Sequence, residues 1–174
     1  MDPKSFLNLA KDISSEFDNI IKPPDEGLPS PTEKVVYFSL VRGTRGYLEK
    51  IVHQINGSYD NGWYDSCAVM IRRLIETLII ECYEAHNIAG KIKDPKGTNG
   101  DYLYLKDLIL KIQSETDFPN SPSRNIKKSL PKLKDIGNLS AHSRWFMAHR
   151  QDIDNIKGDL RIVVQELLSL ARLK

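Results

Sequence analysis

Residues 67–82 read CAVMIRRLIETLIIEC, and this stretch decides the fold class. Its apolar side chains recur at Cys67, Ile71, Leu74, Leu78 and Cys82, spacings of three and four that are typical of an α-helix. Further apolar residues cover much of the remaining circumference. A helix of this kind is expected to be buried on most sides, either by its own domain or by a second subunit.

The helical period recurs on both sides of this stretch, and no segment alternates with period two for long. Expected helices run from Thr32 to about Ile55, from Asp60 or Asn61 to near Ile88, through 102–112, across 126–139, and from about Gln151 to Arg172. Pro131 predicts a kinked helix or two abutting helices in the fourth of these. The fold class is therefore all-α, a bundle of about five to six helices.

The first 31 residues are expected to form an N-terminal helical arm. An apolar stripe from about Pro3 to Ile21 predicts a helix, and residues 23–31, PPDEGLPSP, form a proline-rich linker that can be neither helix nor central strand. The predicted organisation is a helix and linker over residues 1–31 and a helical bundle over residues 32–174.

Length and composition exclude several classes of protein. The 174 residues suit one compact domain with a short appendage, and their 40% hydrophobic content excludes disorder throughout. There is no long uncharged apolar run and no secretion signal, so we expect a cytoplasmic protein without a membrane segment. Cys67 and Cys82 lie roughly 22 Å apart on one helix, too far for a disulfide. No cysteine and histidine spacing suits zinc, so no metal or cofactor is expected.

Charge is distributed unevenly along the chain. The net charge is +2, yet residues 124–150 alone carry seven basic residues against the single acid Asp135, a local net charge of +6 that leaves −4 elsewhere. This asymmetry favours an anionic partner such as RNA, DNA or a nucleotide. The alternative is the solvated basic face of an ordinary helix.

One polar motif lies within this basic segment. Asn138 and His142 are four residues apart and share a helical face, with Lys134 one turn earlier and Arg144 nearby. Cations, an amide and an imidazole together suit a phosphodiester. The alternative is a histidine at a helix end, with Asn138 bonded to a neighbour. Gly137 within a helix costs about 1 kcal/mol relative to alanine, so a packing reason is expected.

The segment 137–142, GNLSAH, follows LKDI at 133–136 and precedes a terminal apolar helix, with AVMIRRLIE at 68–76 upstream. This pattern resembles the HEPN superfamily, in particular its branch with a Gly-Asn-x-x-x-His ending found with restriction and defence systems. The resemblance covers Thr32 to Lys174. It implies a helical bundle, usually a homodimer, in which the polar motifs of both subunits face a shared cleft.

Active members of the family resembled are metal-independent endoribonucleases that use an arginine and a histidine separated by four to six intervening residues, commonly with an asparagine, aspartate or histidine directly after the arginine. Carried over, Asn138 is the polar residue of the motif and His142 the catalytic histidine. The arginine is missing, because residues 135–137 are Asp, Ile and Gly. Only Lys134 or Arg144 lies near enough in sequence to substitute, and a lysine lacks the planar fork of a guanidinium.

Three functions are consistent with the sequence. The first is a nucleic-acid-binding domain, expected for RNA, with a degenerate motif and a partner protein from a defence or toxin-antitoxin operon. The second is an active endoribonuclease that uses His142. The third is a non-catalytic dimeric scaffold. The candidate nucleic-acid-binding residues are Lys128, Lys132, Lys134 and Arg144.

Three charged residues on the apolar helix have two interpretations. Arg72 and Arg73 lie four and three residues before Glu76, so an arginine can form an internal clamp with this glutamate. Alternatively, Arg72 or Arg73 lies at the same cleft as His142 and replaces the missing motif arginine. The clamp is the preferred interpretation because it satisfies the charges locally.

Trp145 and Phe146 are expected to anchor a helix end in the core, with base stacking as the alternative.

Overall fold

The computed structural model describes residues 34–97 and 101–174, together with Asn8 and Lys11. The elements are α2 (Phe38–Val41), α3 (Gly46–Asp60), α4 (Tyr64–Ala85), the 3-10 helix η1 (Ala89–Ile92), α5 (Leu105–Ser114), α6 (Arg124–His142) and α7 (Arg150–Leu170). The only strand-like pairing in the described ranges is an isolated bridge between Lys93 and Tyr102. The all-α prediction is confirmed. The predicted arm falls outside the described residues, apart from Asn8 and Lys11.

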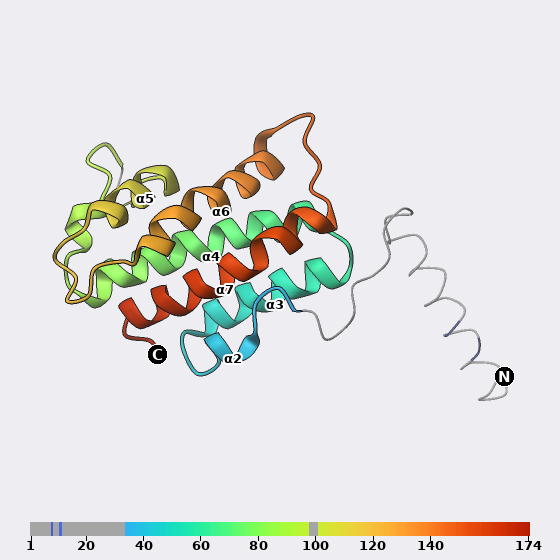
Figure 1. The fold of residues 1–174 in the computed structure, drawn as a ribbon, viewed down its shortest axis with the longest axis horizontal. Coiled ribbons are helices and arrows are strands. Elements are labelled where there is room, and N and C mark those ends of the chain that lie inside the picture. Colours follow the sequence, from blue (N-terminus) through green and yellow to red (C-terminus); the bar gives the residue numbers. More distant parts are fainter. Residues whose placement is uncertain (1–7, 9–10, 12–33, 98–100) are drawn as a thin grey trace.

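Helix α4 lies at the centre of the bundle (Figure 1). Helices α3, α6 and α7 run alongside it, and α5 and η1 pack against it as well. Its fully buried side chains include Ile71, Leu74, Ile75, Leu78 and Ile79. Each such side chain contributes about 1.5–3 kcal/mol when removed from water. The expectation that this helix is buried on most sides is confirmed, and the enclosing surfaces come from its own chain.

Several predicted helix boundaries are wrong. The helix expected from Asp60 or Asn61 begins at Tyr64, because Asp60 is the last residue of α3, and the helix expected from residue 102 begins at Leu105. The segment from Thr32 to about Ile55 was expected as one helix, but α2 and α3 are separate elements. The chain turns between them at Gly43, whose φ of +76° is readily adopted only by glycine, and whose N–H donates to the Glu49 carboxylate at 2.7 Å. Helix α3 also continues beyond Ile55 to Asp60, and Gly62, whose φ is +73°, follows its end.

Helix α6 passes through Pro131 as one continuous helix, so the alternative of two abutting helices is wrong. Its N-terminus is well defined, because the Ser123 Oγ accepts the N–H of Ile126 at 3.3 Å. Glu166 of α7 in turn accepts bonds from both the N–H and the hydroxyl of Ser123, at 2.6 and 2.7 Å. These bonds anchor the start of α6 to α7.

Gly137 is the point at which α6 comes against the backbone of α4. A Cβ atom at this position would lie 2.6 Å from the Cβ of Arg72 and 2.9 Å from the carbonyl oxygen of Ala68. No side chain fits there, so the expected packing reason for this glycine is confirmed. The close approach also brings Arg72 beside the next residue of α6, Asn138.

We expect Gly137→Ala to lower the free energy of unfolding by about 1–3 kcal/mol, because the added methyl group must push α6 away from α4. Gly158→Ala in α7 is the matched control, since nothing lies within 4 Å of a Cβ there. That control is expected to gain about 0.5–1 kcal/mol from the helix preference of alanine. Urea unfolding followed by circular dichroism measures both changes, and equal effects would contradict the packing account.

A charged cluster fixes the end of α5. The Lys91 Nζ lies 2.7 Å from both the Glu115 and the Asp117 carboxylates. Glu115 is buried and also accepts the N–H groups of Thr116 and Asp117, each at 3.0 Å. Burial alone would raise the pKa of Glu115, but the bonds from Lys91 and the two N–H groups outweigh it and lower the pKa below its ordinary value. The cluster thereby ties the C-terminal end of α5 to η1.

The lowered pKa of Glu115 makes its contribution to stability dependent on pH. The contribution is full above the ordinary glutamate pKa of about 4.3 and is lost as the pH falls through the lowered value. We expect Glu115→Gln to reduce the free energy of unfolding by about 1–3 kcal/mol near neutral pH. At about pH 2 the variant and the wild type should differ little. Urea unfolding across this range tests the assignment, and a difference independent of pH would refute it.

Candidate functional site

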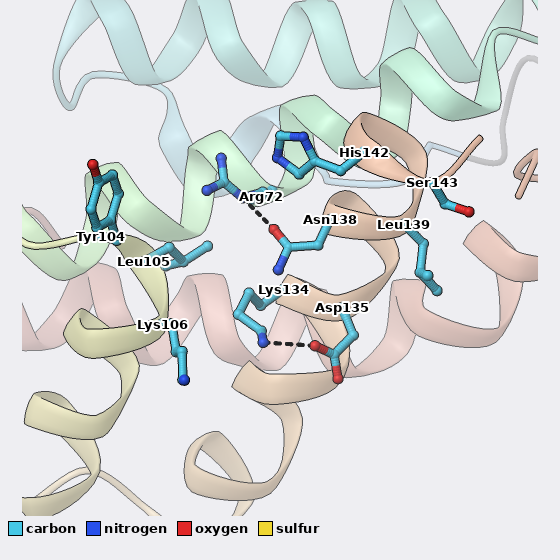
Figure 2. Close-up of a pocket in the computed structure, with 10 residues that line it drawn as sticks. All are labelled: Arg72, Tyr104, Leu105, Lys106, Lys134, Asp135, Asn138, Leu139, His142 and Ser143. Carbon is cyan, nitrogen blue, oxygen red and sulfur yellow. Dashed lines mark hydrogen bonds and ion pairs between the residues drawn. The ribbon is translucent and has the colours of Figure 1, made fainter.

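A groove of about 650 Å³ opens between α4, α5 and the C-terminal half of α6 (Figure 2). Arg72 comes from α4, and residues 104–106 come from the start of α5. The α6 contribution is Lys134, Asp135, Asn138, Leu139 and His142, followed by Ser143. The Asn138 and His142 motif therefore faces an accessible groove and not the core.

The centre of the groove is a hydrogen bond between two helices. The Arg72 Nε donates to the Asn138 Oδ1 at 2.9 Å. The clamp expected within α4 is looser, because the Arg72 Nη1 and the Glu76 Oε2 are 4.0 Å apart and both side chains are about 30% exposed. The closer partner of Arg72 is thus the motif asparagine, and the interpretation that puts Arg72 beside His142 is the one the geometry supports.

This bond also fixes the orientation of the Asn138 amide. With Oδ1 facing Arg72, the Nδ2 points away toward Lys134, as Figure 2 shows. The amide nitrogen carries two N–H donors. The guanidinium of Arg72 adds further donors beside it. The groove centre is therefore rich in donors that match the oxygens of a phosphate.

His142 and the lysines complete the polar lining. His142 is exposed in the last turn of α6, one turn after Asn138. Lys134 is largely covered and pairs with Asp135 at 2.8 Å. Lys106 of α5 is exposed and lines the groove from the other side. The lining thus contains three cations, Arg72, Lys106 and Lys134, and one carboxylate, that of Asp135, so its net charge is positive.

The N-terminus of α5 adds to this positive field. Helix α5 begins at Leu105 on the groove wall, and its N-cap Tyr104 makes no side-chain hydrogen bond to the first turn. The first N–H groups of a helix carry a partial positive charge that favours anions. The helix end therefore acts in the same direction as Arg72, Lys106 and Lys134.

Several candidates from the sequence do not line the groove. Lys128 and Lys132 face a separate hollow against α7, where Lys132 lies 3.9 Å from Asp159. Arg144 follows the end of α6, with its guanidinium 5.0 Å from the ring of Trp145. Arg73 is exposed and does not line the groove.

The expectation that Trp145 anchors a helix end in the core is wrong, because this side chain is 86% exposed. Phe146 is half-buried and packs against the core, so the same expectation is confirmed for it. The loop between α6 and α7 therefore turns one aromatic ring inward and the other out to solvent.

Sequence reasoning missed the contribution of α5. Tyr104 and Lys106 reach the groove only because α5 packs across α4 and α6 in the folded chain. Their sequence neighbourhood carries no motif. The only local signal is a basic residue in the first turn of a helix, which is too common to mark a site.

In the described part of the chain, the cysteines and the potential metal ligands do not form an alternative site. Both cysteines are buried free thiols, and burial raises the pKa of Cys67 to about 12 and raises that of Cys82 as well, so neither is reactive. No group of three or more potential metal ligands occurs among residues 34–97 and 101–174. In the same part of the chain, every helix is too short or too polar to cross a bilayer.

The chain matches no family model, no curated protein and no solved structure.

We expect the Arg72 Nε–H to be protected from exchange with solvent, because it is held by Asn138. In 15N-edited NMR spectra its signal should persist where that of exposed Arg73 exchanges away. Asn138→Ala should abolish the difference. A signal of Arg72 that exchanges as fast as that of Arg73 in the wild type would show that the bond is not formed in solution.

Proposed function

We propose that this groove binds the sugar-phosphate backbone of RNA, as a HEPN-like domain with a degenerate catalytic motif. The observation that carries the proposal is the Arg72–Asn138 hydrogen bond beside the exposed His142. It joins the motif asparagine to a guanidinium from a different helix. A planar guanidinium with a neighbouring amide is suited to the oxygens of a phosphodiester.

The wider setting is part of the same proposal. By its resemblance to the HEPN superfamily, the chain is proposed to act as a homodimer in the cytoplasm, in a prokaryotic defence or toxin-antitoxin context with a partner protein. The all-helical bundle around α4 and the GNLSAH segment support this assignment. The alternative function, a non-catalytic dimeric scaffold, is less favoured, because a scaffold does not require a cationic groove.

Two pairs of lysines allow a matched test of RNA binding. Lys106 and Lys134 line the groove, whereas Lys128 and Lys132 lie on the flank of α6 that faces α7. Replacing either pair by glutamine removes the same charge. We expect Lys106→Gln with Lys134→Gln to weaken binding of single-stranded RNA and to reduce the slope of log affinity against log salt by about 1.4. Lys128→Gln with Lys132→Gln should leave both nearly unchanged.

Fluorescence anisotropy with labelled RNA at several salt concentrations measures both quantities. Equal losses in the two double variants would mean that binding follows overall charge and not the groove. Absence of salt-dependent RNA binding in the wild type would remove the proposal and leave the scaffold function.

A second candidate function is metal-independent RNA cleavage, and the position of Arg72 favours it. The guanidinium that the motif lacks at residues 135–137 is present beside Asn138, supplied by α4. In this mechanism the imidazole of His142 takes the proton of a ribose 2′-hydroxyl or protonates the leaving 5′-oxygen, while Arg72 stabilises charge on the phosphate. Attack by the 2′-oxygen on phosphorus forms a 2′,3′-cyclic phosphate and breaks the bond from phosphorus to the 5′-oxygen, which leaves as a hydroxyl after it takes a proton from the imidazolium or from water.

We expect any cleavage of RNA in the presence of EDTA to fall by about 10²–10⁴ in His142→Ala. Arg72→Lys keeps the positive charge but loses the planar guanidinium, so the rate of cleavage in this variant should fall by about 10²–10³. His149→Ala, which alters an exposed histidine outside the groove, is the control. Cleavage that survives in His142→Ala would exclude this mechanism.

A further inference from the structure

An exposed aromatic ring stands on the wall of the groove. Tyr104 is 77% exposed and immediately precedes α5. Its backbone is fixed, because its carbonyl accepts the N–H groups of Asp107 and Leu108 at 2.8 and 3.0 Å. The next residue, Leu105, is only 1% exposed and anchors the start of the helix. The ring is therefore presented to the groove from a well-held position (Figure 2).

A second tyrosine two residues earlier shows the contrast. The hydroxyl of Tyr102 donates to the Glu84 carboxylate, and the Lys93 ammonium lies 3.6 Å from the centre of its ring. The bond to Glu84 raises the pKa of Tyr102 to about 12. Tyr102 is thus engaged within the chain, whereas Tyr104 is turned toward solvent beside the cationic lining.

Resting on the proposed function, we infer that Tyr104 stacks on an unpaired base of the bound strand and so makes the groove select single strands over duplexes. Arg72 of α4, with Asn138 and Lys134 of α6, suits the phosphate on one side of the groove. A tyrosine ring on the α5 side suits the face of a base, and base–aromatic stacking tolerates every base. In a duplex the bases already stack on one another and cannot reach the ring.

The tyrosine hydroxyl has no part in stacking, so phenylalanine is expected to replace it. Tyr47 supplies a matched control, because it is 45% exposed on α3 and does not line the groove. The probes are labelled oligo(A), the oligo(A)·oligo(U) duplex, and an abasic ribose-phosphate strand of the same length. The abasic strand keeps the phosphates and removes the bases.

Binding of these probes to the full chain tests the inference. We expect Tyr104→Ala to weaken binding of oligo(A) by about tenfold, to leave binding of the abasic strand and the duplex within about twofold, and Tyr104→Phe to retain wild-type affinity. Tyr47→Ala should behave as the wild type with all three probes.

The outcomes separate this inference from the proposed function. Suppose that the wild type binds oligo(A) and that the Lys106 and Lys134 double variant binds it more weakly, but that Tyr104→Ala binds it as the wild type does. The stacking role of Tyr104 is then wrong, and the proposal of an RNA-binding groove stands. If Tyr104→Ala weakens all three probes equally, Tyr104 supports the shape of the groove and stacks on nothing, which also overturns the inference. If the wild type binds none of the probes, both proposals fall.

Discussion

The site depends on the absence of one side chain. Gly137 allows α6 to lie against the carbonyl of Ala68 and the Cβ of Arg72, and any larger residue would collide with both. At this separation the Arg72 guanidinium reaches across to Asn138. The contact that packs two central helices is therefore also the contact that assembles the centre of the groove. Glycine at position 137 lowers the intrinsic stability of the helix, but it allows both the packing of α6 against α4 and the formation of the site.

Much of the fold follows from local pattern. The spacing of apolar residues in α4 and α7 predicts both helices because each buries one or more faces along its whole length. The break between α2 and α3 was not predictable in this way, since it depends on the positive φ of Gly43 and on its bond to Glu49. Helix α6 is continuous through Pro131, whereas the sequence periodicity was equally consistent with one kinked helix or two abutting helices.

Part of the groove lining could be predicted from the sequence, and the rest depends on tertiary packing. Asn138, His142 and Lys134 share a helical face and were found from spacing alone. Lys128 and Lys132 belong to the same basic segment, but a helix turns about 100° per residue and places them on another flank of α6. Arg72 and Tyr104 come from other helices, and only tertiary packing brings them to the groove.

The affinity of folded Gly137→Ala for oligo(A) RNA tests the central claim most directly. If the close approach of α6 to α4 builds the groove, this variant should lose as much affinity as Arg72→Ala at a temperature where circular dichroism shows both to be folded. Gly158→Ala should bind as the wild type does. An unchanged affinity in folded Gly137→Ala, with Arg72→Ala impaired, would contradict the claim that this contact assembles the site.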